Sequence, residues 1–385
     1  MKISFLCFDL SDNSLGRAAL LAKALSQHHE VELIGPARGG EIWFPLRELD
    51  LPIKLFPWKR YPAFASTIWR MVREIDGDVL YACKLRPTSF GIGLLKKAAS
   101  GKPLVVDIDD WELGFFYHSN FWGRIGRFLN LSNPNGLPYT WLMEKLARFA
   151  DAVTVSNRFL EERFPGTVLY HCRDTKALDP ARFDSERAKE ELGLGGKKVL
   201  MFLGTPRAHK GVDDLIAALA GVKDRETRLV IIGADEGKDF PRERLGAVAG
   251  RVLVLPKIPF PMLPQRLAAA DIVVIPQRRT SDTVGQMPAK LFDAMAMAKP
   301  IISTRVSDIP EVLDDCGYLV EPGNVKQLAS AIDYVSGHPE EARLKGQRAR
   351  QRCVEFYDTR ALAARLLEML NPFEPGRKAS GNNRQ

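Results

Sequence analysis

Short apolar runs and amphipathic stretches alternate along the chain from its first residues. The run ISFLCF (3–8) is rich in β-forming residues, and the polar turn DLSDNS and then Gly16 follow it. From Arg17 the segment RAALLAKALSQHH has helical periodicity, and VELIG (31–35) returns to strand character. A strand, a loop with a glycine, a helix and a second strand form one βαβ unit, the building block of a parallel, doubly wound sheet.

This pattern recurs in two series. Apolar runs without alternation, as expected of strands covered on both faces, lie at 78–83, 103–109 and 152–156. After a polar stretch at 173–198, strands are expected at 198–204, 228–233, 251–256, 271–276 and 300–304, and helices at 211–222 and 291–298. We therefore predict an α/β protein of two consecutive Rossmann-like halves, with the seam near 175–195 and a disordered tail after Asn371.

Composition and charge narrow the possible partners. The chain has 385 residues, of which 45% are hydrophobic and 26% charged, as in an ordinary globular protein. Lys and Arg number 55 against 47 Asp and Glu, a net charge of +8. This excess favours contact with anionic surfaces or phosphorylated ligands, and it is too small to indicate a nucleic-acid-binding protein.

Cysteine spacing and hydropathy indicate in which cellular compartment the protein is expected. The five cysteines form no CxxC pair, which is typical of reduced thiols in a cytoplasmic protein. No segment approaches the roughly 18 to 20 apolar residues that a membrane helix needs. We expect a soluble protein inside the cell.

The aromatic residues are unevenly distributed. All six tryptophans lie in the first half, and the segment 115–130 mixes large aromatics with arginines. One interpretation is an aromatic core with a solvated basic face. The other is a surface that meets a sugar or a lipid headgroup, because rings and cations both favour such contacts.

The strand-end segment FLGTPRAHKG (202–211) is the first candidate for chemistry. Gly204 lets the chain leave the strand sharply, and Arg207, His209 and Lys210 then cluster before a helix. The partial positive charge of a helix N-terminus adds to these cations, so the segment suits a diphosphate. The alternative is a loop whose basic residues only face water.

The second candidate is TVGQMPAKLFDAMAMAKPIIST (283–304). Pro288 suits the first turn of a helix, and Gly285 precedes it. Asp293 lies within the apolar helix, where its carboxylate needs a hydrogen-bond partner that ligand hydroxyls would provide. Stabilisation by the helix dipole is the alternative.

The third candidate is DIDDW (107–111), where three acids cluster at the end of a first-half strand. Such a cluster suits a divalent metal, a sugar hydroxyl or a general base, or it caps a helix. The six histidines show no HExxH or HxH spacing, so a zinc site is not expected.

The ordered set of second-half motifs resembles glycosyltransferase family 4, whose members are retaining, nucleotide-sugar-dependent enzymes with the GT-B fold. The motifs are FLGTPRAHKGVDDLIAAL, LVIIGADEG, LPQRLAAADIVVIP, MPAKLFDAMAMAKPIISTRVSDIPEVL and GYLVEPGN, and ADAVTVSNRFLEERF and VLYHCRDTKALDP extend the similarity toward the first half. The resemblance implies two Rossmann-like domains that face each other across a cleft.

The resemblance also implies roles for residues of the second half. Lys210 matches the family lysine that binds the donor diphosphate. The family arginine follows the strand-end glycine, where this chain has Thr205, and Arg207 would take over its task. Asp293 occupies the place of the acid that holds the ribose hydroxyls, and Lys290 would be a further phosphate or ribose contact.

Several positions depart from the family pattern. The first family glutamate corresponds to Gly285, and Asp282 is the nearest spare carboxylate. Asp109 occupies the place of a family histidine beside the donor sugar, and Gly16 resembles the flexible loop glycine near the phosphates. Ser307-Asp308 replaces a usual glycine pair.

The resemblance implies a retaining transfer of a sugar from a nucleotide diphosphate sugar to the hydroxyl of a glycan or lipid-linked acceptor, in bacterial envelope or exopolysaccharide synthesis. In such enzymes fixed cations replace a metal, so the resemblance also implies that no cofactor is needed. A nucleotide-sugar epimerase or a non-catalytic homologue is the alternative.

The expected organisation follows the family. An acceptor domain would span 1–175 and a nucleotide-sugar domain 176–355, with a helix at 356–371 that crosses back to the first domain and a tail at 372–385. A cytoplasmic location with peripheral contact to the inner membrane is expected.

Overall fold

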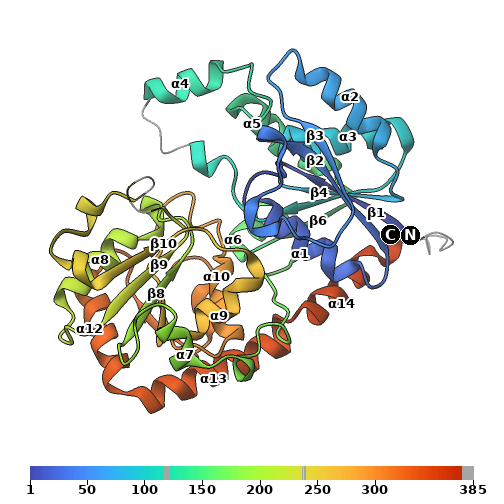
Figure 1. Ribbon diagram of the computed structural model, residues 1–385. Coiled ribbons are helices and arrows are strands. Elements are labelled where there is room, and N and C mark those ends of the chain that lie inside the picture. Colours follow the sequence, from blue (N-terminus) through green and yellow to red (C-terminus); the bar gives the residue numbers. More distant parts are fainter. Residues whose placement is uncertain (117–120, 236, 238–239, 375–385) are drawn as a thin grey trace. The chain divides into compact units, whose positions relative to one another are not determined.

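The computed structural model describes residues 1–116, 121–235, 237 and 240–374 (Figure 1). The chain divides into two compact units. Unit 1 comprises Met1–Trp43, Glu48–Tyr170 and the chain from Arg360 onward, and unit 2 comprises Phe44–Arg47 and His171–Thr359. The boundary therefore lies five residues before the expected position at 175, and the return to unit 1 begins at 360 rather than 356.

Unit 1 is built on a parallel sheet whose strand order is β3-β2-β1-β4-β5-β6-β7. The order reverses between β1 and β4, as in a Rossmann-like fold. The strands are β1 (Lys2–Cys7), β2 (Glu30–Ala37), β3 (Ile53–Pro57), β4 (Val79–Cys83), β5 (Leu104–Ile108), β6 (Ala152–Val155) and β7 (Thr167–Val168). Its helices are α1 (Leu15–Leu25), α2 (Phe64–Glu74), α3 (Ile92–Ser100), α4 (Phe121–Leu129), α5 (Leu137–Leu146), α6 (Arg158–Arg163) and all but the first residue of α14 (Thr359–Leu370).

One face of this sheet carries the larger core cluster of unit 1. Alternate strand residues such as Leu6, Leu80 and Val106 are fully buried there. Met71 of α2 and Met143 of α5 pack into the same cluster, so these helices cover the same face. The period-two alternation of strand side chains is what separates this face from the other.

Unit 2 is built on a second parallel sheet, of order β10-β9-β8-β11-β12-β13, which reverses between β8 and β11. The strands are β8 (Val199–Leu203), β9 (Arg228–Ile232), β10 (Val252–Leu255), β11 (Ile272–Ile275), β12 (Ile301–Thr304) and β13 (Tyr318–Val320). The helices are α7 (Ser185–Glu190), α8 (Val212–Gly221), α9 (Leu263–Ala268), α10 (Ala289–Ala296), α11 (Ile309–Leu313), α12 (Val325–Gly337) and α13 (Pro339–Phe356). The predicted pair of Rossmann-like sheets is thus confirmed.

Some expectations differ from the structure in detail. Helix α10 begins at Ala289, so Pro288 precedes the helix instead of lying in its first turn. The helix ends at Ala296, and Ala298 adopts a left-handed φ of 53° beyond it. Residues Asn371–Phe373 form a short 3₁₀ turn, whereas 375–385 of the predicted disordered tail lie outside the described residues.

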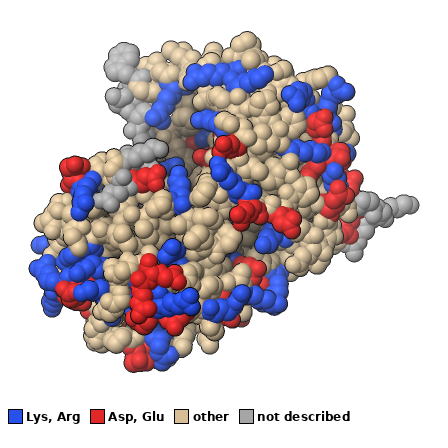
Figure 2. Space-filling model, in the orientation of Figure 1, with Lys and Arg blue, Asp and Glu red and all other residues tan. Residues whose placement is uncertain are grey.

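Over the residues that the structure describes, no helix is both long and apolar enough to span a bilayer. The face drawn in Figure 2 shows basic and acidic side chains interspersed over much of the surface. The net charge of +8 is therefore not gathered into one continuous basic surface on that face.

Candidate functional site

The turn after β8 brings three predicted donor residues together. Gly204 has a φ of 114°, which a residue with a side chain rarely adopts. A Cβ atom at this position would lie 3.3 Å from Cε of Lys290 and 3.6 Å from Nζ of Lys210. The absence of a side chain at Gly204 therefore lets two lysines converge on one backbone position.

This position lies where the strand order of unit 2 reverses. Gly204 follows β8, and Lys290 lies in the first turn of α10, after the neighbouring strand β11. Open α/β sheets bind ligands at the carboxyl ends of their strands at such a reversal. The lysine pair thus occupies the edge of the sheet where a ligand is expected.

Lys290 is poorly compensated by its surroundings. Burial lowers its pKa, and the nearby Arg173 adds to the effect, whereas Asp293 acts in the opposite direction. A buried ammonium in this situation gains from an anion that binds beside it. The site is therefore electrostatically suited to a phosphate group.

A second glycine positions Lys210. Gly211 follows the 3₁₀ turn Ala208–Lys210 and has a φ of 69°. A Cβ atom there would lie 1.8 Å from the carbonyl oxygen of Pro276, at the end of β11. Only glycine fits this contact without a shift of the backbone.

Asp293 has a protein partner that the sequence did not reveal. It is 2% exposed, and both carboxylate oxygens accept hydrogen bonds from the guanidinium of Arg173. Arg173 thus supplies the partner that this buried carboxylate needs within the protein, and a contact between Asp293 and ligand hydroxyls stays a prediction. The available signal was a buried acid that required a cation, together with Arg173 in the motif VLYHCRDTKALDP.

The loop after β11 holds Asp282 and Gly285, whereas Arg207 lies in the turn after β8. Asp282 is 3% exposed, lies 3.1 Å from Nδ1 of His209 and accepts a hydrogen bond from Thr280. It therefore ties the loop to the turn that carries Lys210. Arg207 is exposed at the start of that turn. Gly285 is buried.

Thr205 lies directly after Gly204, and its carbonyl oxygen accepts a hydrogen bond of 2.9 Å from the backbone of Arg207. The structure therefore assigns Thr205 a place in the turn. The donor-binding roles of Thr205, Arg207 and Gly285 stay predictions.

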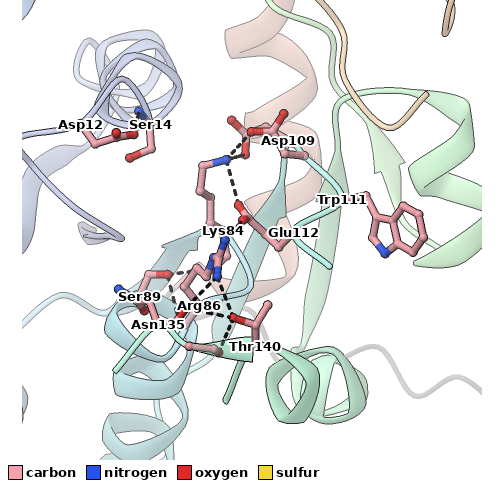
Figure 3. A network of polar contacts seen from close by, with 12 residues as sticks. Asp12, Ser14, Lys84, Arg86, Ser89, Asp109, Trp111, Glu112, Asn135 and Thr140 are labelled. Carbon is pink, nitrogen blue, oxygen red and sulfur yellow. Dashed lines mark hydrogen bonds and ion pairs between the residues drawn. The ribbon is translucent and has the colours of Figure 1, made fainter. Parts of the chain in front are cut away.

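In unit 1, the acids after β5 surround a lysine (Figure 3). The Nζ atom of Lys84 lies 2.8 Å from Asp109, 2.5 Å from Asp110 and 3.0 Å from Glu112. These three acids have the spacing of a metal site, with ligand atoms within 4.8 Å of one another. The ammonium group supplies the positive charge in their midst.

Asp109 has an unusual electrostatic environment. Burial raises its pKa to about 7, the acids Asp110 and Asp107 act in the same direction, and Lys84 opposes them. Asp107 itself is fully buried and accepts hydrogen bonds of 3.0 and 2.9 Å from Arg17. The first acid of DIDDW thus anchors α1, whereas Asp109 is the acid that titrates near neutral pH.

Gly16 is not in a flexible loop. It lies in the first turn of α1, and a Cβ atom there would meet only the ring of Trp43, at 3.6 Å. The loop conformation expected from the family is corrected accordingly, because the helix already begins at Leu15. A phosphate contact by Gly16 stays a prediction.

The comparisons with known proteins concern the family and the fold. The family model described as "Glycosyl transferases group 1" matches residues 197–338, and the "Glycosyl transferase 4-like domain" model matches residues 17–168. The chain is 26% identical to a GDP-mannose-dependent alpha-(1-6)-phosphatidylinositol monomannoside mannosyltransferase from Mycolicibacterium smegmatis. That match covers 83% of this chain and 82% of the relative.

Two solved structures show the same fold. HepE from Anabaena in complex with UDP-glucose has a TM-score of 0.74 at 18% identity, over 97% of this chain and 100% of that one. Sucrose-phosphate synthase from Thermosynechococcus elongatus has a TM-score of 0.73 at 15% identity, over 97% and 98% of the two chains. The two family models together span most of the sequence, and with the GT-B fold they show that this protein belongs to the group 1 glycosyltransferases, family 4, and is a glycosyltransferase.

Proposed function

We propose that this enzyme transfers a sugar from a nucleotide diphosphate sugar to an acceptor hydroxyl, and that unit 2 binds the donor. The convergence of Lys210 and Lys290 on Gly204 carries the proposal. The relative from M. smegmatis is named as GDP-mannose-dependent, and HepE was solved with UDP-glucose, so both use or bind a donor of this class.

The two lysines would act on the leaving group. When the bond between the anomeric carbon and the phosphate oxygen breaks, negative charge develops on the diphosphate. Fixed cations that are already in place stabilise this charge without reorganisation, which is commonly the largest single contribution to catalysis. These cations would do the work that a metal ion does elsewhere, and we propose that no metal is required.

Asp109 would act on the sugar. As the anomeric bond breaks, the sugar gains positive charge, and a carboxylate beside it lowers the energy of that state. We propose retention of configuration by a same-face route. The acceptor oxygen bonds to the anomeric carbon on the face that the diphosphate leaves, and the acceptor proton passes to a phosphate oxygen.

The surface of unit 1 supports a lipid-linked acceptor. Trp69 on α2 is 61% exposed and Trp141 on α5 is 49% exposed. Arg73 lies 4.4 Å from the ring of Trp69, and Lys145 lies 5.9 Å from that of Trp141. Exposed rings beside cations suit the headgroup region of an anionic membrane, so we propose peripheral attachment at the cytoplasmic face.

The name of a relative supports the acceptor class. The M. smegmatis relative is named for a phosphatidylinositol mannoside, which is a lipid. We propose a glycan or lipid-linked acceptor of the bacterial envelope or of an exopolysaccharide.

A ligand panel tests the donor class. The full-length protein is heated with UDP, GDP or ADP, and the unfolding temperature is measured for each. A ligand that binds only the folded state at 100 times its Kd stabilises that state by about 2.7 kcal/mol, so one nucleotide should raise the temperature clearly above the others.

The preferred nucleotide is then supplied as its sugar conjugates with candidate acceptors. Transfer to an acceptor supports the proposal. Conversion of the donor without an acceptor would indicate an epimerase instead, and no stabilisation by any nucleotide would contradict the donor site.

A further inference from the structure

Lys84 has a backbone conformation that is unusual for a residue with a side chain. It follows β4 directly, and its φ is 78°. Left-handed backbone costs such a residue roughly 1–2 kcal/mol, and it persists where the surroundings enforce it, often at functional sites. The Lys84 amide donates to the carbonyl oxygen of Asp107 at 2.8 Å, and its carbonyl accepts from Ser89 Oγ at 2.8 Å.

The side chain of Lys84 is clamped at its charged end. Its ammonium contacts Asp109, Asp110 and Glu112. Of these three acids, Asp109 and Glu112 are buried and Asp110 is half-buried. Arg86 holds the other oxygen of Glu112 from the opposite side (Figure 3). Glu112 therefore cannot turn away, and the ammonium stays between Glu112 and Asp109.

The charges of this cluster do not cancel. When all groups are ionised, four carboxylates meet three cations among the described residues: Asp107, Asp109, Asp110 and Glu112 against Arg17, Lys84 and Arg86. A buried excess charge is costly, and uptake of one proton relieves it. Asp109 is the member whose pKa, at about 7, places that proton near neutral pH.

A purely stabilising role explains this arrangement poorly. Buried ion pairs contribute little net stability compared with apolar side chains of similar size. The cluster also lies at the carboxyl ends of β4 and β5, next to the reversal of strand order between β1 and β4. Such a place in an open α/β sheet is where ligands bind.

We propose that Lys84 is a positioning residue, which fixes the direction of the Asp109 carboxyl group and favours its ionised form for the transfer reaction. The inference rests on the function proposed above for Asp109 and deepens it.

The charged groups that face Asp109 set the sign of the effect. Lys84 and, from α1, Arg17 favour the carboxylate, whereas Asp107 and Asp110 favour the protonated acid. Replacing Lys84 with an uncharged residue removes the largest favourable charge. Asp109 then holds its proton to higher pH, and a rate that needs the carboxylate begins to fall at a higher pH as the solution is acidified.

The first test measures kcat and donor KM across about pH 5 to pH 9 for the full-length enzyme. For Lys84→Met we expect kcat to fall by about tenfold or more with little change in donor KM. We also expect the acidic limb of the plot of kcat against pH to shift to higher pH by about one unit. Lys84→Arg should return the acidic limb most of the way to its wild-type position. An unshifted limb in Lys84→Met would overturn the proposal, whether or not activity falls.

The control is Lys97→Met. Lys97 forms an ion pair of 2.7 Å with Asp151 in the same unit. Asp151 directly precedes β6, so this pair lies at the amino end of a strand, whereas the Lys84 cluster lies at the carboxyl ends of β4 and β5. It should keep the wild-type kcat and pH profile. A matching shift in this variant would show a general loss of charge and would contradict the assignment to Lys84.

The second test does not depend on activity. A carbon-13 NMR titration of the aspartate carboxyl groups gives the pKa of Asp109 in the wild type and in Lys84→Met. We expect an increase in the variant, and an unchanged pKa would overturn the proposal. Should Lys84→Met fail to fold, Lys84→Gly removes the ammonium at a position whose φ suits glycine, and the same increase is expected.

The two proposals fail in different ways. If Asp109→Asn keeps the wild-type kcat and acidic limb, the proposed role of Asp109 in transfer is wrong, and with it the positioning role of Lys84. If Asp109→Asn loses activity while the NMR titration shows no coupling to Lys84, only the inference about Lys84 is wrong.

Discussion

Two buried lysines experience opposite electrostatic surroundings. Carboxylates on three sides raise the pKa of Lys84 well above its usual value, despite its burial. Burial lowers the pKa of Lys290, and Arg173 adds to this effect, whereas Asp293, whose carboxylate is paired with Arg173, acts in the opposite direction. The charge of Lys84 is therefore balanced within the protein, whereas burial disfavours the charged form of Lys290, which an anion bound beside it would favour.

Lys210→Ala tests the lysine of the turn after β8. Removing one fixed cation from the developing charge should lower kcat by roughly 10²–10³-fold, the usual effect of losing one preorganised group. Steady-state kinetics with the preferred donor measures it. Lys223→Ala, an exposed lysine of the same unit, is the control and should be neutral. Wild-type turnover in Lys210→Ala would contradict the assignment.

Asp109→Asn tests the raised pKa through stability. Asp109 has a pKa of about 7 in the folded protein and an ordinary value of 3.8. Between these values the folded state holds a proton that the unfolded state has lost. This group therefore removes up to about 1.4 kcal/mol of stability per pH unit as the pH rises through that window.

The Asp109→Asn variant should lack this loss of stability with rising pH, because asparagine does not titrate. Urea unfolding of both proteins between pH 4 and pH 7 isolates the difference, because all other groups are shared. A pH-independent difference between the two proteins would show that Asp109 is already ionised at acidic pH.

At the scale of elements, the turn from β8 to α8 depends on one close contact. The Cβ atom of an alanine at 211 would lie 1.8 Å from the carbonyl oxygen of Pro276, in addition to the cost of a φ of 69°. We expect Gly211→Ala to destabilise the protein by more than about 2 kcal/mol and to weaken donor binding.

Gly193→Ala is the matched control for this prediction. Gly193 has nearly the same φ, 68°, but nothing lies within 4 Å of its Cβ position. It should show only the backbone cost of roughly 1–2 kcal/mol. Equal losses in the two variants, measured by denaturant unfolding, would show that the approach of Pro276 is unimportant.

Strands with continuous apolar runs could be predicted from the sequence, since burial on both faces leaves a clear pattern. Strand β3 was missed, because Leu55 is exposed at this sheet edge and Pro57 ends the strand. The last strand of each sheet, β7 and β13, is only two or three residues long. So short a segment carries no periodicity.

The site could be predicted in part. The glycines and lysines of the donor turn lie within motifs that are contiguous in sequence. The basic partners of the acids lie outside the motifs that contain those acids. Arg173 lies 120 residues before Asp293, and Lys84 lies 25 residues before Asp109. Such pairs depend on strand order, which a single sequence does not reveal.

At the scale of the whole molecule, the described tryptophans lie outside the fully buried core. Of the five whose side chains the structure describes, Trp69 and Trp141 are exposed and the other three are half-buried. The described tryptophans of unit 1 therefore lie at least partly at its surface, where the proposal places a lipid, whereas Phe5, Phe64, Tyr81 and Phe90 are fully buried in the core.

A Trp69→Ala/Trp141→Ala double variant tests that surface. We expect its binding to vesicles that contain phosphatidylglycerol to weaken by about tenfold or more, because each ring buries apolar area in the interface. Sedimentation with vesicles measures it. Tyr334→Ala, which removes an exposed ring of unit 2, is the control. Equal binding by the double variant and the wild type would contradict the proposed membrane contact.

The lysine pair at Gly204 is tested most directly by isothermal titration calorimetry with a nucleoside diphosphate and the matching monophosphate. If Lys210 and Lys290 grip the second phosphate, the wild type should prefer the diphosphate by about tenfold or more, which corresponds to about 1.4 kcal/mol. Lys210→Ala/Lys290→Ala should lose that preference, and Lys223→Ala should keep it. A double variant that still discriminates like the wild type would contradict the account.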